Sequence, residues 1–199
     1  ADRGIDRLLL LEQGKDLEQR RRRSPKDMLC GWGGAGAYSD GKLTLSPEVG
    51  GNLGEFLDRD SLNHLLKEAD QIYVAHGAPG HVFGEASPAL ENLSDRARLA
   101  DLDLVPARIR HIGTENCRRV LGRLRASLTG QIETRTGCPV KRLLAEEGQI
   151  RGIKLADGQV ITSRFVVAAP GRSGATWMKA EAKAIELKTR ANPVDIGIR

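Results

Sequence analysis

The chain has 199 residues, of which 40% are hydrophobic and 29% charged, and it carries a formal net charge of +5. This composition is typical of a globular protein that buries a core, and no apolar run approaches the length of a membrane span. The three cysteines lie far apart without Cys-x-x-Cys spacing, so a disulfide framework and a zinc site are both disfavoured and we expect no metal. Because no signal peptide is recognisable, we expect a cytoplasmic protein with no membrane partner.

The first predicted element is a short strand at residues 8–11, a run of leucines that suits a strand buried on both faces of a parallel sheet. Glu12 ends this strand. In dinucleotide-binding βαβ folds, an acid at the end of a strand accepts hydrogen bonds from a ribose hydroxyl. Glu12 is therefore a candidate nucleotide ligand, and a helix-capping or surface carboxylate is the alternative interpretation.

Arginines occupy residues 20–23, directly after a segment, residues 15–19, that is predicted to form a short helix. Cations in the last turn of a helix complement its dipole and stay solvated, which is the interpretation we favour. A phosphate contact and a nucleic-acid contact are the alternatives. Aromatic residues make up only 4% of the chain, which is poor material for stacking bases, so we do not expect a nucleic-acid partner.

Glycines are concentrated in residues 31–43, together with Tyr38, Asp40 and Lys42, side chains that a flexible linker does not need. So many glycines weaken local order unless the backbone must approach a ligand closely or adopt positive φ. Residues 31–36 spell the dinucleotide fingerprint Gly-x-Gly-x-x-Gly, but turn segments flank it where a strand and a helix are required. We therefore discount the fingerprint and interpret the loop as a ligand contact of another kind.

Two helices are predicted next along the chain. Residues 58–75 have amphipathic spacing, with Asp60 or Ser61 available as the cap, and a second helical stretch runs from Ser87 to residue 102. Neither helix carries an obvious arrangement of catalytic or metal-ligating residues.

A strand is predicted at residues 104–112, and a helix opens after it at Gly113-Thr114. Apolar residues recur on one face of this helix, and the predicted core face consists of Cys117, Val120, Leu121, Leu124 and Leu128. Cys117 is therefore interpreted as a core residue. The arginines on the other face, Arg118 among them, are predicted to be solvated.

The last third of the chain is richer in strand patterns. Residues 131–136, 138–145, 149–155 and 159–162 are predicted to form a small antiparallel meander. Residues 165–169 are continuously apolar, so we expect a return strand in the interior of the main sheet.

The loop at residues 170–174 follows this apolar run and contains Ser173. A strand that stops in glycines before a helix is typical of a phosphate-binding turn or of a nucleophile elbow. The elbow is excluded by spacing, because the second glycine of Gly-x-Ser-x-Gly is absent. Ser173 is then interpreted as a cap of the helix that starts at Ala175, as a neighbour of a ligand, or as both.

In chain order these features are a strand with an acid, a glycine-rich loop, antiparallel strands and an apolar strand with Pro-Gly. This order resembles the FAD-binding fold of the glutathione reductase superfamily. Residues 33–43 and 168–174 resemble, more narrowly, a family of largely uncharacterised FAD-dependent dehydrogenases, and residues 112–114 and 192–199 also resemble its pattern. The fold implied is mixed α/β, a partial FAD/NAD(P)-binding Rossmann-like domain with an antiparallel β insertion.

The resemblance also implies residue roles. Glu12 would meet the adenosine ribose, Val140 would place its backbone against adenine, and glycines would lie along the flavin or pyrophosphate. The implied cofactor-binding set is Glu12, Gln13, Gly33, Gly34, Ala35, Lys42, Val140, Ala169, Gly171 and Ser173. No catalytic residue or substrate is identified, NAD(P)H is an open partner, and Tyr38, Asp40 and Lys42 are the first residues to mutate.

The resemblance divides the chain into four segments. Residues 1–57 are a partial FAD-binding segment, 58–104 a helical insertion, 105–179 a continuation of the FAD-binding domain with the β meander, and 180–199 the start of a substrate domain. Because the first strand and the fingerprint loop of the family are absent from these residues, we expect an inactive fragment that does not hold FAD tightly. A non-catalytic basic module for an anionic partner such as RNA is the alternative function.

Overall fold

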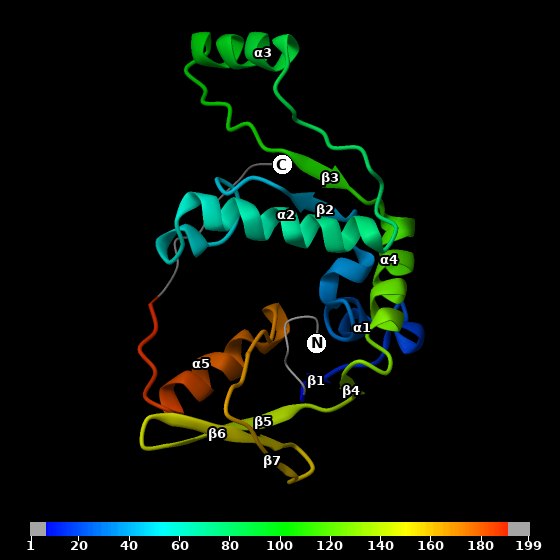
Figure 1. Ribbon diagram of the computed structural model, residues 1–199, viewed down its shortest axis with the longest axis vertical. Coiled ribbons are helices and arrows are strands. Elements are labelled where there is room, and N and C mark those ends of the chain that lie inside the picture. The colour runs from blue at the N-terminus through cyan, green and yellow to red at the C-terminus, as the bar shows by residue number, and fades with distance from the viewer. Residues whose placement is uncertain (1–6, 191–199) are drawn as a thin grey trace.

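The computed structural model describes residues 7–190, so the resemblance at residues 192–199 lies outside the described part (Figure 1). The strands are β1 (Leu9–Glu12), β2 (Lys42–Thr44), β3 (Ile109–His111), β4 (Glu133–Thr136), β5 (Val140–Glu146), β6 (Gln149–Leu155) and β7 (Val160–Thr162). The α-helices are α1 (Pro25–Leu29), α2 (Arg59–Ala75), α3 (Pro88–Leu99), α4 (Thr114–Ser127) and α5 (Ala175–Ala184). Short 3-10 helices are η1 (Leu17–Gln19), η2 (Gly34–Tyr38), η3 (Leu53–Glu55) and η4 (Arg172–Gly174).

The strands form three small sheets, which makes the chain a mixed α/β protein. β1 pairs with β4 in parallel, β2 pairs with β3 antiparallel, and β5, β6 and β7 form an antiparallel meander. The predicted meander was therefore wrong by one strand, since residues 133–136 leave it to pair with β1. The reason is that Leu9 to Glu12 lie in register beside Glu133 to Thr136, so the backbone groups of β4 form their hydrogen bonds with β1.

The predicted helix that follows Gly113 is confirmed as α4, and Cys117 is confirmed as a core residue. Cys117 and Val120 are buried in one cluster with Ala78 and Ile112. A second cluster joins Leu17, Trp32 and Ala37 from the amino-terminal part to α4 residues such as Leu121. A third lies between the meander and α5 and contains Leu143, Ile153 and Leu155.

Two ion pairs connect helices to strands. Arg110 of β3 is buried and pairs with Asp70 of α2 through Nε at 2.5 Å and Nη2 at 2.7 Å. Glu181 of α5 is also buried, and it accepts hydrogen bonds from the backbone N–H of Leu143 at 2.7 Å and from Arg142 of β5. Satisfied buried charges of this kind fix one helix orientation, since breaking them would leave an unpaired charge.

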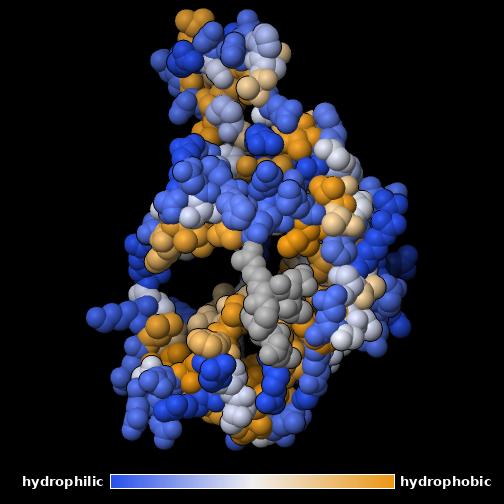
Figure 2. Space-filling model, viewed as in Figure 1, coloured by the Kyte–Doolittle hydropathy of each residue, from blue (hydrophilic) through white to orange (hydrophobic). Residues whose placement is uncertain are grey.

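The elements are spread out in space (Figure 1). α3 stands at one end on two extended arms, α2 lies beside the β2–β3 pair, and the meander with α5 lies at the opposite end. The space-filling view shows an open hollow between the α2 layer and the α5 layer (Figure 2). Among the described residues, no helix has both the length and the apolar character required to cross a bilayer.

The strand predicted at residues 165–169 is wrong. The segment forms no strand, and its side chains Phe165 and Val167 are 80% and 93% exposed. Val166 alone is packed, against the cluster of the meander and α5. An apolar run becomes a buried strand only where neighbouring strands supply hydrogen bonds on both edges, and no described strand lies in register with this one.

Several element boundaries also differ from prediction. The strand expected at residues 104–112 is limited to Ile109–His111, because only these residues pair with β2. The helix expected at residues 58–75 is confirmed, but its cap is Asp58, whose carboxylate accepts from the N–H of Ser61 at 2.9 Å. The helical stretch expected from Ser87 to residue 102 is α3, which ends at Leu99, and Ser87 is its N-terminal cap.

Candidate functional site

The carboxyl end of β1 is the centre of the candidate site. Glu12 is half-buried there, and its Oε1 accepts a hydrogen bond from the backbone N–H of Gly14 at 2.7 Å. The thiol of Cys30 lies 4.0 Å from the same oxygen. Within residues 7–190, the second oxygen, Oε2, has no hydrogen-bond partner. Glu12 is thus held in place by its own loop and keeps one acceptor available.

Gln13 and Ser173 meet at this end of the strand. The side-chain amide of Gln13 donates to Oγ of Ser173 at 3.2 Å, across a sequence separation of 160 residues. The prediction that Ser173 caps α5 is wrong, because the cap position belongs to Gly174 and no side chain bonds to it. Ser173 lies one residue earlier, in η4, where its hydroxyl faces Gln13 and not the helix end.

Val140 reaches the same neighbourhood through the backbone. The carbonyl of Glu12 accepts from the N–H of Cys138 at 3.0 Å, so the start of β5 is tied to the end of β1. Val140 and Leu11 pack against the same apolar cluster. The structure therefore brings Glu12, Gln13, Val140 and Ser173 together, and their assigned roles stay predictions.

Close packing explains some glycines of the loop. A Cβ at Gly14 would lie 2.5 Å from the backbone nitrogen of Gly31, and a Cβ at Gly33 would lie 2.6 Å from Leu121. Gly33 is also left-handed, with φ of 79°. These glycines are required by chain-on-chain contact and conformation, so they are not by themselves evidence of a ligand.

Other loop positions face open space. A Cβ at Gly34 or Gly36 would meet no atom within 4 Å, and Ala35 between them is exposed. A loop whose backbone is bare in this way leaves room for a phosphate or a planar ring to approach. Gly34 and Ala35 leave room for the predicted cofactor contact, which stays a prediction, whereas Gly33 is required by its left-handed backbone.

Arg20 holds the glycine-rich loop in shape, and the prediction that it is a solvated helix-end cation is wrong. It is only 4% exposed, and its guanidinium donates to the carbonyl oxygens of Asp27, Met28, Trp32 and Gly34. Burial lowers the pKa of its guanidinium. No local sequence signal separates Arg20 from its neighbours Arg21, Arg22 and Arg23, which are all exposed.

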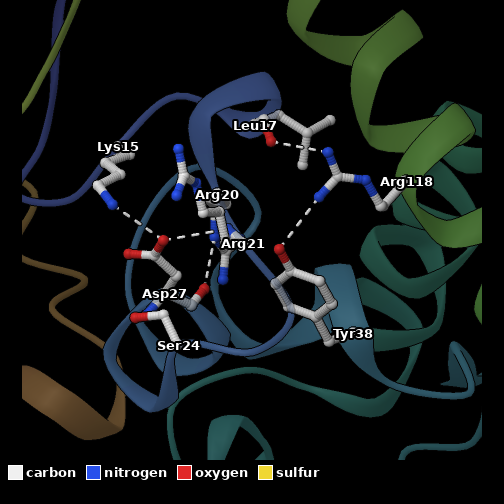
Figure 3. A network of polar contacts seen from close by, with 8 residues as sticks. All are labelled: Lys15, Leu17, Arg20, Arg21, Ser24, Asp27, Tyr38 and Arg118. Carbon is white, nitrogen blue, oxygen red and sulfur yellow. Dashed lines mark hydrogen bonds and ion pairs between the residues drawn. The ribbon is translucent and has the colours of Figure 1, made fainter.

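Asp27 organises a network beside Arg20 (Figure 3). Its carboxylate accepts from Nζ of Lys15 at 2.9 Å and from the backbone N–H of Arg21 at 3.0 Å. These two bonds, that of Lys15 first, hold the pKa of Asp27 below its usual value. Ser24 caps the N-terminus of α1 by accepting from the N–H of Asp27.

Tyr38 lies between two guanidinium groups. Arg20 and Arg118 have their Cζ atoms 5.0 and 5.7 Å from the ring centroid, within cation–π range. Arg118 also donates to the Tyr38 hydroxyl at 3.2 Å and to the carbonyl of Leu17 at 2.8 Å (Figure 3). The prediction that Arg118 is simply solvated is therefore wrong, because the loop folds back over α4.

Asp40 and Lys42 form an ion pair at 3.0 Å, and more than half of each side chain is exposed. The hydrogen bond from Lys42 holds the pKa of Asp40 below its usual value. No contact among residues 7–190 joins this pair to Glu12, so Lys42 is not brought to the end of β1. Ala169 and Gly171 are exposed, with Gly171 two residues before Ser173.

The thiols and carboxylates near the site do not form a metal centre. Within the described part of the chain, no group of three or more histidine, cysteine or carboxylate side chains could hold a metal ion. Burial, and secondarily the charge of Glu12, raises the pKa of the Cys30 thiol. Cys30 is therefore a neutral thiol at pH 7 beside the Glu12 carboxylate.

Comparison with known proteins finds no matching protein-family model and no matching curated protein. Among solved structures, the L-amino acid deaminase from Proteus myxofaciens in complex with anthranilate matches 86% of this chain at 16% identity and a TM-score of 0.32. L-amino acid deaminase from Proteus vulgaris matches 93% at 17% identity and 0.34, and its form lacking the specific insertion sequence matches 90% at 17% and 0.35. The chain spans 41–50% of the length of these structures. At such TM-scores the likeness carries no argument about this chain's function.

Proposed function

We propose that this chain forms part of an FAD-dependent oxidoreductase and that the carboxyl end of β1 binds the adenosine half of FAD. The hydrogen bond between Gln13 and Ser173 carries the proposal, because it joins two motifs 160 residues apart at one place. Both motifs belong to the family that the sequence resembles. Their meeting beside Glu12 is what a shared dinucleotide site requires.

The side chains at this place suit an adenosine ribose. A ribose diol needs a fixed hydrogen-bond acceptor, and Glu12 offers Oε2 while Gly14 holds Oε1. Gln13 and Ser173 add an amide and a hydroxyl next to it. Gly34 leaves its backbone bare on the loop that Arg20 anchors. These residues offer the acceptor, amide, hydroxyl and bare backbone that the adenosine and phosphate groups of FAD would need.

FAD, when bound, supplies the hydride-accepting chemistry of such an enzyme. The chain's own part is to bind and orient it, with Glu12 on the ribose and the glycine-rich loop along the rest of the cofactor. Tyr38, Asp40 and Lys42 are the candidates for substrate contact, since they occupy the same loop and their side chains carry polar or charged groups. The substrate is not identified, and NAD(P)H is the electron donor that we propose to test first.

The test compares FAD with FMN, which lacks the adenosine half. Flavin fluorescence quenching, with flavin in excess, should show that the protein binds FAD more tightly than FMN. Glu12→Gln should weaken FAD binding by about tenfold, because a charge-assisted bond to the ribose becomes a neutral one, and should leave FMN binding unchanged. Glu147→Gln, in the exposed turn between β5 and β6, removes the same charge away from the site and should change neither.

Two results would contradict the proposal. Equal affinity for FAD and FMN would show that the end of β1 does not hold adenosine. Equal losses for Glu12→Gln and Glu147→Gln would show that the effect is one of overall charge. Circular dichroism of both variants checks that the fold is retained.

A further inference from the structure

A second polar site is lined in part by Arg20. Arg22, Tyr38, Arg118 and the first turn of α4 line a pocket of about 260 Å³. Its lining differs from the candidate FAD site, because Glu12, Gln13 and Ser173 take no part in it. The pocket therefore calls for an explanation of its own.

The pocket has an excess of positive charge. Arg20 is buried and also lines the pocket; among residues 7–190 its guanidinium donates to carbonyl oxygens and to no carboxylate, and Glu12 is the nearby carboxylate whose charge acts on it. Arg118 likewise donates to the Leu17 carbonyl and the Tyr38 hydroxyl. Buried cations in proteins are ordinarily paired with an anion, because burial without one carries a desolvation penalty.

The remaining lining adds hydrogen-bond donors. Arg22 is exposed, and among the described residues it forms no hydrogen bond or ion pair. α4 begins after Gly113, which supplies no side-chain cap, so the first-turn N–H groups at Thr114 and Glu115 point toward this end without a side-chain acceptor. Glu115 is the one carboxylate in the lining, against three guanidinium groups.

We propose that this pocket binds the phosphate group of a small phosphorylated molecule. Arg22 and Arg118 supply the fork-shaped donors that match a phosphate dianion, and the first turn of α4 supplies backbone donors. A volume of about 260 Å³ admits a phosphate with a small attached group but not a dinucleotide. The pocket shares Arg20 and Tyr38 with the glycine-rich loop, but Glu12, Gln13 and Ser173 take no part in its lining, so it is distinct from the end of β1.

The probe is inorganic phosphate, titrated at constant ionic strength against chloride and followed by amide NMR signals of Thr114 and Glu115. We expect saturable shifts with phosphate and none with chloride. Arg22→Gln should weaken phosphate binding about fivefold, and Glu115→Gln should strengthen it, since one removes a donor and the other a repelling charge. Arg23→Gln is the matched control, because Arg23 is an exposed neighbour outside the pocket and should change nothing.

The proposal is overturned if phosphate shifts these amides no more than chloride does. It is also overturned if Arg22→Gln and Arg23→Gln weaken binding equally, which would indicate a diffuse basic surface. Binding of a short RNA with a steep salt dependence and no response to phosphate would assign the arginines to nucleic acid instead. None of these results bears on FAD, since Glu12 is unchanged in every variant.

Discussion

Arg20 has a structural role that its exposed neighbours lack, because its side chain is buried. Among the arginines at residues 20–23, it alone is buried. Its one guanidinium donates hydrogen bonds to several backbone carbonyls of α1 and of the glycine-rich loop. A carbonyl left unpaired inside a protein costs about 1–3 kcal/mol, so a single side chain that satisfies several of them has a large effect on stability. The shape of the glycine-rich loop therefore depends on Arg20.

Replacement of Arg20 by methionine tests this dependence. Arg20→Met replaces the unbranched stem of the side chain but not the guanidinium, so it leaves buried carbonyls without donors and should lower the free energy of unfolding by about 2–4 kcal/mol. Urea unfolding followed by tryptophan fluorescence measures it, since Trp32 is buried in the adjoining cluster. Arg23→Met should change the value by less than about 0.5 kcal/mol. A small loss for Arg20→Met would mean that water replaces the guanidinium.

Asp27 makes the free energy of unfolding depend on pH in the acid range. Because its pKa is held down by Lys15 and Arg21, its contribution is fully present above the ordinary aspartate pKa of about 3.9 and is lost as the pH falls through the lowered value. Asp27→Asn should therefore flatten the decline of unfolding free energy at acid pH. Lys15→Met should flatten it partly, because it removes the largest cause. Unfolding measured from pH 7 to pH 2 that is parallel in wild type and Asp27→Asn would contradict this assignment.

At the scale of elements, the segment after β7 shows that an apolar sequence pattern does not by itself produce a buried strand. Residues 165–169 have the composition of a buried strand, yet only Val166 reaches the core cluster of the meander and α5. Val167 is 93% exposed while Val166 is packed, because successive side chains of an extended chain point to opposite sides. Phe165 and Val167 therefore present an exposed apolar surface.

Aspartate substitutions distinguish the two sides of this segment. Val166→Asp should destabilise the protein by about 1–3 kcal/mol, since a charge enters a partly buried cluster. Val167→Asp should change stability by less than about 0.5 kcal/mol and should reduce binding of the dye ANS, which reports exposed apolar surface. Thermal unfolding and ANS fluorescence measure both. Equal destabilisation by the two variants would show that the segment is buried on both sides.

For the whole molecule, α3 stands apart from the three core clusters. None of its residues is buried, and the two arms that lead to it are joined at their base by backbone hydrogen bonds between Phe83 and Ile109 of 2.8 and 2.9 Å. The arms therefore start from one fixed point (Figure 1). The residues between Phe83 and Ile109, α3 included, therefore act as one long loop. The length of a loop has little effect on stability.

Removal of this projection tests its independence. Replacing residues 87–104 by a short Gly-Ser linker should leave the thermal unfolding midpoint within about 3 °C of the wild-type value, because that shift corresponds to only about 1 kcal/mol in a chain of this size. Differential scanning calorimetry measures it. A large fall in the midpoint, or a loss of the single transition, would show that α3 contributes to the core. As a control, Val120→Ala in buried α4 should lower the midpoint clearly.

The sequence by itself determined the elements whose signals are local. Amphipathic spacing located α2 and α4, strand patterns at residues 138–145 and 149–155 located the β5–β6 hairpin, and an acid after leucines placed Glu12 at a strand end. Such features depend on neighbours a few residues away. Tertiary structure alone decided which arginine is buried, which strand pairs with β1, and that Ser173 faces Gln13. Those outcomes depend on partners far along the chain, and burial and hydrogen-bond satisfaction are settled only when these partners meet.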